Sequence, residues 1–381
     1  MTHVLILGAG FGGLELATTL DEELGGEVDV TLIDRSDSFT VGFDKLAVLF
    51  GKKQPEEVRS YYRDLAAGGV DFRQEEVRSI DPVARHVVTD ANTYDADVLV
   101  VALGAALDAA ATPGLAEIGH EFYSLPGVER LAGELTSFES GTIVIGVLGL
   151  PYKCPPAPWE AALLLHDFLV RRGVRDAVRI RAISPAPAPL PISADGSAVI
   201  AEQFGASGID LLVGRRIVAL DPNEHAAVLD DGEQVPFDLF MGVPVHRVPE
   251  VVAAAGLADG GWVRVDPYTL ETTHPNVFAI GDVTTIPVGQ GAIPKAGAFA
   301  DRAARSVAQT IASRVRGTGE PGRFDGVGAC YLEFGEGNIA KVDADYLSGS
   351  EPRVAFLGPS AEYVPDKERF AATRLGRWFR D

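Results

Sequence analysis

The chain has 381 residues, of which 46% are hydrophobic, and this is enough for two or three domains with a large core. Its formal net charge of −21 argues against a nucleic-acid-binding protein and against general adsorption to anionic lipid. No apolar run reaches the roughly 18 residues that cross a bilayer, and the sequence opens directly on a predicted strand. We therefore expect a cytoplasmic protein with, at most, peripheral membrane contact.

A glycine-rich motif of the form G-x-G-x-x-G occupies residues 8–13, between an apolar strand at residues 3–7 and a predicted helix at residues 14–20. In such a turn the first glycine permits tight turning, the second lets the backbone approach a pyrophosphate, and the third lets helix and strand pack closely. Free N–H groups at the helix N-terminus then bind the phosphates. The candidate nucleotide-binding residues here are Gly8, Gly10, Phe11, Gly12 and Gly13.

The context of the motif strengthens this interpretation. A second apolar strand at residues 28–33 ends in Asp34, about 20 residues after the last glycine, where an acid accepts ribose hydroxyls. Arg35 follows as a further candidate at the same site, and the loop at residues 39–43 is predicted to run past the cofactor. Residues 1–50 are thus predicted to form a nucleotide-binding β-α-β unit.

A second α/β unit is predicted from a strand at residues 142–146, a helix at 160–172 and a strand at 178–183. No G-x-G-x-x-G can be placed after the first of these strands. The second ends in Ser184, which offers neither an acid for a ribose nor an arginine for a 2′-phosphate. We expect this unit to keep the Rossmann shape without the nicotinamide nucleotide.

Later segments return to the first unit. A buried strand at residues 97–103 closes on Gly104, with Ala102 beside the nucleotide, and another strand at 277–282 ends in Gly281 and Asp282. A carboxylate there suits the ribityl chain of FAD, although Gly-Asp is also a common turn pair. A helix predicted at 294–314 would point its N-terminus at the flavin, with Lys295 as a helper.

These patterns predict an α/β fold with two Rossmann-like units and a small α+β C-terminal unit. The FAD-binding domain is expected at residues 1–108 and 248–318, and the second Rossmann-like domain at 109–247. Residues 319–381 are expected to hold a hairpin (329–334 with 339–342), a strand at 353–357 and a helix at 366–381.

Two cysteines, Cys154 and Cys330, are the only ones in the chain, and their surroundings show no metal-binding spacing. From the sequence alone, the simplest interpretation is that they are two unrelated buried thiols, as cytosolic cysteines usually are. Three prolines hold Cys154 before a helix whose dipole is expected to lower the thiol pKa. Glu160, in the first turn of that helix, is a candidate acid–base group or simply a capping acid.

The dinucleotide-binding elements resemble the two-dinucleotide-binding-domain flavoproteins along the whole chain. Within them, the run from Tyr152 to Glu160 (YKCPPAPWE) is similar to the flavoprotein subunit of flavocytochrome c sulfide dehydrogenase and to the sulfide:quinone oxidoreductases. Gly328–Tyr331, Pro294–Gly297 and Lys367–Phe370 match the same group. The resemblance implies FAD, a redox-active pair made by Cys154 and Cys330, and Glu160 as the acid–base residue beside it. It also implies sulfide or a small sulfur donor as substrate and a quinone or cytochrome as acceptor.

The chain departs from this group in three ways, because it has two cysteines where many quinone-reducing members use three, no export signal, and a short C-terminal helix. These departures affect the expected electron acceptor more than the flavin chemistry. Two other function classes stay open. One is an NAD(P)H-dependent flavoprotein reductase, against which the missing second fingerprint counts, and the other is a non-catalytic flavin-binding protein.

The last segment has two interpretations of its own. Residues 366–381 carry an apolar stripe flanked by arginines, which suits either an interfacial helix or one docked on the protein. Phe334, Phe356 and Tyr363 are expected to add an apolar slot for a quinone ring.

Overall fold

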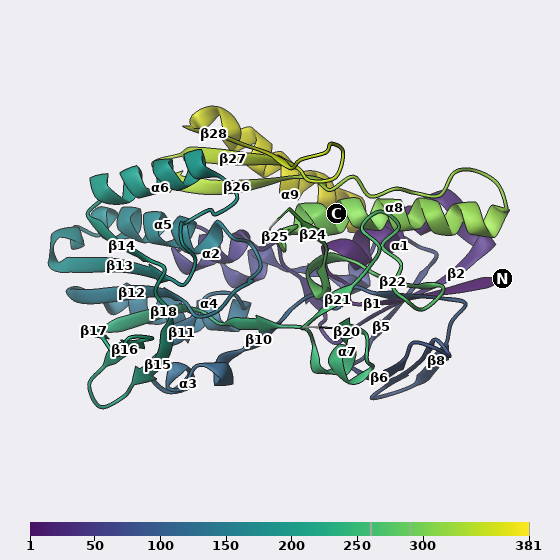
Figure 1. Cartoon of the computed structure of the whole chain (residues 1–381), viewed down its shortest axis with the longest axis horizontal. Coiled ribbons are helices and arrows are strands. Elements are labelled where there is room, and N and C mark those ends of the chain that lie inside the picture. The colour runs from purple at the N-terminus through teal and green to yellow at the C-terminus, as the bar shows by residue number, and fades with distance from the viewer. Residues whose placement is uncertain (260, 290, 381) are drawn as a thin grey trace.

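The computed structural model describes residues 1–259, 261–289 and 291–380. Two parallel sheets lie end to end along the long axis of the molecule, and each carries helices (Figure 1). The first sheet has the order β22-β9-β1-β2-β5. Its strands are β1 (Thr2–Leu7), β2 (Val28–Asp34), β5 (Val70–Gln74), β9 (Val98–Val101) and β22 (Val277–Ala279). Since β22 comes from late in the chain, this unit is completed only after the second one.

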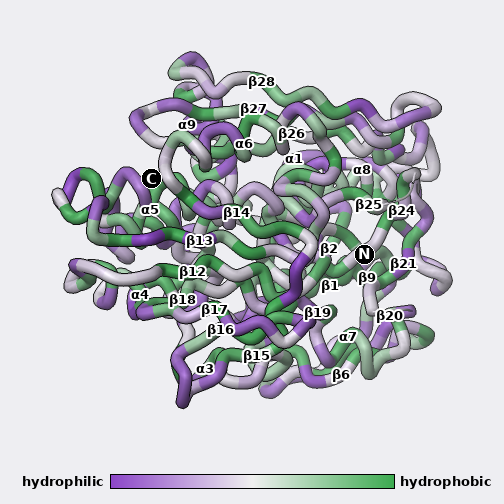
Figure 2. The backbone as a smooth tube through the Cα atoms, turned by 60° about the vertical axis from the view of Figure 1, so that its left-hand side comes forward, coloured by the Kyte–Doolittle hydropathy of each residue, from purple (hydrophilic) through white to green (hydrophobic). Residues whose placement is uncertain are grey.

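The inner strands of the first sheet are buried because helices cover it, whereas the edge strand β5 is largely exposed. Residues 4–7 of β1 are fully buried, and β9 is buried throughout. α1 (Phe11–Leu24) and α8 (Gly297–Arg316) pack side by side against one face. Strands covered in this way are mainly apolar, and β1 and β9 lie among the green segments in the interior in Figure 2.

The second sheet has the order β11-β18-β12-β13-β14 and is also parallel. Its strands are β11 (His120–Glu121), β12 (Gly141–Val147), β13 (Val178–Ser184), β14 (Ile209–Val213) and β18 (Leu239–Val243). Its main helices are α4 (Leu125–Ser137), α5 (Ala157–Arg171) and α6 (Ala194–Ala206). The predicted Rossmann-like α/β class is confirmed, whereas α4 and α6 were not anticipated.

The C-terminal unit is an antiparallel sheet of β26 (Val327–Gly335), β27 (Asn338–Asp345) and β28 (Arg353–Ser360), followed by α9 (Val364–Trp378). The expected hairpin is confirmed by the pairing of β26 with β27. This unit lies along one side of the molecule, and β26 contacts both α5 of the second unit and α8 of the first (Figure 1). The division into an interrupted first domain, a second domain and a tail stays a prediction.

Smaller sheets, short strands and short helices complete the fold. Two three-stranded sheets are β6 (Val77–Asp81), β7 (His86–Thr89) and β8 (Thr93–Asp95), and β15 (Ile217–Asp221), β16 (Ala226–Leu229) and β17 (Gln234–Pro236). A third contains β20 (Ala258–Asp259), β21 (Trp262–Arg264) and β23 (Thr284–Thr285). Two-residue and three-residue strands are β3 (Ser38–Phe39), β4 (Ser60–Tyr61), β10 (Ala106–Asp108), β19 (Val245–Arg247), β24 (Pro287–Val288) and β25 (Gly291–Ala292). The short helices are α2 (Asp44–Leu49), α3 (Leu115–Ile118) and α7 (Glu250–Ala254).

Three predicted boundaries were wrong in ways that affect the site. β22 ends at Ala279, and Gly281 opens a 3-10 turn instead of closing the strand. α8 begins at Gly297 and not at residue 294, so Lys295 precedes the helix. α9 ends at Trp378, three residues earlier than predicted, and Asp381 lies outside the described residues.

Candidate active site

A cavity of about 270 Å³ lies where the first sheet, the start of α5 and the tail sheet meet. Crevices beyond the carboxyl ends of parallel strands are the usual ligand sites of such folds. Of the predicted site residues, the lining includes Gly10, Phe11, Gly12, Ala102, Gly104, Cys154, Glu160, Gly281, Asp282, Lys295 and Cys330. The segment from Phe39 to Phe43 lines it too, as expected for a loop that passes the cofactor.

The glycine-rich turn has the geometry that a dinucleotide site requires. Gly8 has φ +102°, and a Cβ there would overlap the carbonyl of Ala102. A Cβ at Gly13 would overlap the carbonyl oxygen of Gly8, whereas one at Gly10 would meet nothing within 4 Å. Gly8 and Gly13 are therefore needed for packing, and Gly10 leaves the backbone open to a phosphate group.

Asp34 and Arg35 both lie outside the cavity lining. The Asp34 carboxylate accepts hydrogen bonds from the Ala9 and Ser36 N–H groups, each 2.8 Å long, so it fixes the glycine-rich turn. The Arg35 side chain is 77% exposed, and its nearest acid is Glu76 at 3.9 Å. A cofactor contact by Arg35 is therefore not supported, and ribose binding by Asp34 stays a prediction.

Asp282 is the clearest sign that the cavity accommodates FAD. Within the described chain its buried Oδ1 atom has no hydrogen-bond partner. Burial raises the pKa of this carboxyl, while the charges of Lys153, Lys295 and Lys45 oppose the shift. Buried polar atoms are rarely left unpaired, and a carboxylate suits the hydroxyls of a ribityl chain. The open glycine turn and this free acceptor together fit FAD.

Lys295 lines the cavity, and neighbouring carbonyl groups hold its ammonium. Its Nζ donates to the carbonyl oxygens of Asp282 at 2.7 Å and Thr284 at 2.9 Å, and lies 3.4 Å from the ring centroid of Trp262. Burial lowers its pKa to about 8. The side chain therefore holds the turn that carries Asp282, because its position ahead of α8 turns it back toward that segment.

The structure brings Cys154 and Cys330 to the same cavity from distant parts of the chain, and both carry free thiols. Cys154 lies in the loop before α5 with φ +55°, a strained conformation that costs about 1–3 kcal/mol. Its N–H donates to the Lys295 carbonyl at 2.7 Å. Cys330 lies within β26, opposite Val342 of β27. Sequence patterns alone gave no reason to pair them.

Both thiols have raised pKa values, so the expected lowering by a helix dipole is wrong. Burial raises the pKa of Cys330 to about 12 and that of Cys154 well above the ordinary thiol value. Each thiol also lies near negative groups, including Glu160, and Cys154 precedes α5 by three residues. Because desolvation outweighs the dipole at this position, reduced cysteines here stay protonated near neutral pH.

Glu160 is 1% exposed and belongs to a charge cluster that the sequence did not reveal. Lys367 of α9 donates from Nζ to Glu160 Oε1 at 2.7 Å and to Glu333 Oε1 at 2.7 Å. Lys52 donates to the other oxygen of Glu333 at 2.9 Å, nearer the surface. Burial raises the pKa of Glu160, while Lys367 counteracts it. Lys367 lay in a segment with a family resemblance, but nothing in the sequence indicated its partner.

The family model for pyridine nucleotide-disulphide oxidoreductases matches residues 2–304. The chain belongs to this family. Members of the family bind FAD, and the protein is an FAD-dependent oxidoreductase, as predicted. The cofactor would be held by the residue 8–13 turn and by the segment around Asp282.

The resemblance to sulfide:quinone oxidoreductases is confirmed. The mitochondrial enzyme of Mus musculus is 25% identical over 365 residues, which cover 91% of this chain and 78% of that protein. The type II NADH:quinone oxidoreductase of Staphylococcus haemolyticus is 24% identical over 363 residues, covering 86% and 89%. The solved sulfide:quinone oxidoreductase of Aquifex aeolicus superposes with a TM-score of 0.85 at 24% identity, covering 99% of this chain and 92% of that one.

The ends of β12 and β13 in the second unit are closely packed. Trp159 of α5 is buried and donates from Nε1 to the Pro189 carbonyl at 2.8 Å, which holds the proline-rich loop against the helix. Ser184, at the end of β13, is fully buried, and a Cβ on Gly146 would overlap the Phe240 ring. That this unit binds no nicotinamide nucleotide stays a prediction.

The three aromatic residues predicted to form a quinone slot do not line this cavity, whereas other aromatic residues do. Phe370 of α9 lines it with Tyr331 and Phe43, whose ring centroids lie 5.9 and 6.2 Å from that of Phe370. Phe334 and Phe356 instead pack on each other, 6.3 Å between ring centroids, in the core shared with the second unit. With Tyr363 also outside the cavity lining, the expected quinone slot at these three residues is wrong.

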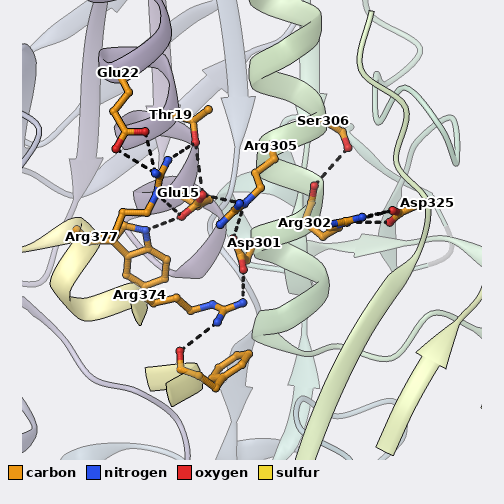
Figure 3. A network of polar contacts seen from close by, with 12 residues as sticks. Glu15, Thr19, Glu22, Asp301, Arg302, Arg305, Ser306, Asp325, Arg374 and Arg377 are labelled. Atoms are coloured by element: carbon orange, nitrogen blue, oxygen red, sulfur yellow. Dashed lines mark hydrogen bonds and ion pairs between the residues drawn. The ribbon is translucent and has the colours of Figure 1, made fainter. Parts of the chain in front are cut away.

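Helix α9 is docked on the first unit by charges (Figure 3). Arg377 and the Trp378 indole bind fully buried Glu15 of α1 at 3.3 and 2.7 Å, and Arg374 binds Asp301 of α8. The exposed residues of α9 are small or polar, so its apolar stripe faces inward. They are Pro365, Glu368, Arg369, Ala372, Thr373 and Gly376. Among the described helices none is both long and apolar enough to cross a bilayer.

Proposed function

We propose that the protein oxidises sulfide, or a closely related thiol or persulfide, through Cys154 and Cys330 and transfers the electrons by way of FAD to a quinone. The observation that carries this proposal is the meeting of the two cysteines in the cavity that also contains the glycine-rich turn and Asp282. The relatives named above support a quinone as the acceptor. A cytochrome remains the alternative acceptor that the sequence resemblance implies.

The chemistry requires the cysteines to be joined in the oxidised enzyme. Hydrosulfide attacks one sulfur of the Cys154–Cys330 bond, a new S–S bond forms, and the other cysteine departs as a thiolate. Joining the resulting persulfide to that thiolate restores a bridge with an extra sulfur and releases two electrons and one proton. When bound, FAD supplies the two-electron acceptor beside the cysteines.

Glu160 is suited to handling the proton in these steps. Burial raises the pKa of its carboxyl and so favours the protonated form, while Lys367 stabilises the ionised form at 2.7 Å. The surroundings of Glu160 thus stabilise both the protonated and the ionised form of its carboxyl group. A thiolate whose own pKa is raised leaves more easily when a proton donor stands nearby, and Glu160 lines the same cavity as both thiols.

The decisive experiment mixes purified FAD-loaded protein anaerobically with sulfide and, separately, with NADH, and follows flavin absorbance by stopped flow. We expect rapid bleaching by sulfide and slow or no bleaching by NADH. C330S should lose the sulfide reaction while keeping its FAD. Fast bleaching by micromolar NADH would favour the NAD(P)H-dependent reductase, and bleaching by neither would favour a non-catalytic flavoprotein.

A second measurement tests the cysteine bond. In the unreduced, freshly isolated protein, alkylation under denaturing conditions should find no free thiol, and intact mass should match a bridge with or without extra sulfur. Disulfides are uncommon in cytosolic proteins, so a bond here would indicate redox use. Two freely alkylated cysteines in active, unreduced protein would contradict the proposal.

A further inference from the structure

Two buried polar atoms near Cys154 have no role in the function proposed above. Tyr123 is 6% exposed, and within the described chain its hydroxyl has no hydrogen-bond partner. His246 is 5% exposed, and its Nδ1 lies 2.8 Å from the Pro244 carbonyl, so Nδ1 carries the proton. Its Nε2 is left as a neutral acceptor that no described residue satisfies. The two rings pack edge to face with centroids 5.2 Å apart.

Two lysines flank this polar pair. Lys45 and Lys153 line the cavity together with Tyr123 and Cys154. Lys45 donates to the Tyr123 carbonyl at 2.9 Å. Lys153 immediately precedes Cys154, and among residues 1–259, 261–289 and 291–380 we find no hydrogen bond or ion pair that involves its ammonium. Burial, followed by the charge of Lys153, lowers the pKa of Lys45 to about 8.

The acidic groups nearby do not neutralise these lysines fully. Glu121 accepts hydrogen bonds from the N–H groups of Tyr123 and Ser124 at 2.7 and 2.9 Å, so its carboxylate is engaged by the backbone. Asp282 is the acid that fits the cofactor. Burial and the surrounding lysines lower the pKa of His246 to about 4, which keeps it neutral. A chain of net charge −21 thus presents a locally cationic chamber beside Cys154.

We propose that Lys153, Lys45 and Tyr123 form a subsite that binds the sulfur donor as a singly charged anion, hydrosulfide, next to Cys154. This inference rests on the proposed function and specifies the ionic form of its substrate. The anionic sulfur accepts from the lysine ammonium groups and the tyrosine hydroxyl. His246 packs on the Tyr123 ring and lies outside the cavity lining. Hydrosulfide is also the form that attacks a sulfur–sulfur bond.

The subsite is tested with thiocyanate, a singly charged sulfur anion that we use as a non-reducing probe. FAD-loaded protein is titrated, and binding is followed by the flavin spectrum and by calorimetry. We expect K153Q to raise the dissociation constant about tenfold or more, which corresponds to about 1.4 kcal/mol, while K153R keeps it within about threefold. Y123F should weaken binding severalfold. K53Q is the matched control, since Lys53 pairs with Asp44 and lies outside the cavity.

Kinetics separate this inference from the proposed function. In K153Q we expect the sulfide concentration for half-maximal flavin reduction to rise about tenfold, with a limiting rate within about threefold of the parent. If sulfide fails to bleach the parent protein, the proposed function fails, while the thiocyanate titration still decides the anion subsite. Unchanged thiocyanate binding in K153Q and Y123F would overturn it. Loss of FAD from K153Q would likewise overturn it, because the lysine would then serve the cofactor.

Discussion

The ammonium of Lys367 lies 2.7 Å from Glu160 Oε1 and so connects the C-terminal helix to the helix that follows Cys154. The side chains of Lys367 and Glu160 are 7% and 1% exposed, and Glu333 completes the cluster at 2.7 Å from the same ammonium. Removing one member of such a group leaves an uncompensated buried charge. The tail unit is thus coupled electrostatically to the chemistry that we propose at the cysteines.

Substitution K367M should change both stability and pH dependence. Because Lys367 favours ionised Glu160, its loss should raise the Glu160 pKa further, so that the carboxyl keeps its proton to higher pH. The pH profile of the rate of flavin reduction by sulfide should have a part that reflects the ionisation of Glu160, and this part should shift to higher pH. The free energy of unfolding should fall by about 3–5 kcal/mol, as for other broken buried pairs.

The control for K367M is K52M, which removes the outer lysine of the same cluster. Its side chain is 42% exposed, so the loss should stay below about 1 kcal/mol with little change in the pH profile. Denaturant melts and stopped-flow rates across pH measure both effects. An unshifted pH profile in K367M would show that Glu160 does not govern it.

The raised thiol pKa values predict slow alkylation of the reduced protein. With the Cys330 pKa near 12, the thiolate fraction at pH 8 is about 10⁻⁴, compared with about a quarter for an ordinary thiol. A thiolate of higher pKa is also more nucleophilic, which offsets part of this difference. Folded, reduced protein should therefore react with iodoacetamide at least about tenfold more slowly than free cysteine, and about tenfold faster per pH unit up to the denaturation limit. Rapid alkylation at neutral pH would show that an ionised thiol exists in the folded state.

The parts of the structure that the sequence predicted are those fixed by local pattern. The glycine-rich turn, the position of Asp34 at the end of β2 and the tail hairpin all follow from short-range rules of strand, turn and helix. The boundary of α8 was missed because a run of apolar and small residues continues upstream of Gly297. Lys295 consequently lies ahead of the helix, and its role beside the flavin stays a prediction.

Short-range sequence patterns could not predict the contacts between segments that are distant in the sequence. Nothing in residues 150–160 indicates that β26 would bring Cys330 to Cys154, and only the family resemblance paired them. The Lys367–Glu160 contact and the pairing of Arg377 with Glu15 also join segments that are distant in the sequence. The error in the Cys154 pKa arose because a helix dipole is a local effect, whereas burial is set by the whole fold.

The buried packing of α9 predicts that the C-terminal segment is structural. Trp378 is fully buried and donates to Glu15 at 2.7 Å, so W378A should lower the free energy of unfolding by about 3–5 kcal/mol. Deleting residues 367–381 should impair folding, since it also removes Lys367 from Glu160. R369E, on the outward face of the helix, should stay within about 0.5 kcal/mol of the parent.

Liposome flotation completes this test. If the exposed side of α9 does not bind membranes, R369E and the parent protein should partition identically into anionic vesicles. Parent flotation that R369E abolishes would instead establish the interfacial role for this helix. A W378A protein that unfolds like the parent would contradict the structural role.

Substitution of Phe370 should slow the reoxidation of the flavin by quinone and leave its reduction by sulfide nearly unchanged. Phe370 lines the cavity and also an adjoining groove of about 660 Å³ between α8 and the tail sheet, so it stands where the flavin site opens toward the C-terminal unit. Tyr331 and Phe43 lie beside it, with ring centroids at 5.9 and 6.2 Å. A planar quinone ring gains about 0.5–1.5 kcal/mol from such an aromatic contact.

F370A should therefore slow reoxidation of the reduced flavin by a water-soluble quinone up to about tenfold, while reduction by sulfide stays within about twofold. F356A is the matched control, since Phe356 belongs to the same tail sheet but packs on Phe334 outside the cavity. Double-mixing stopped flow, with sulfide first and quinone second, measures both rates in one protein. Equal reoxidation rates in F370A and the parent would place quinone reduction elsewhere, because an aromatic residue at the mouth of the flavin site would then make no contact with the acceptor.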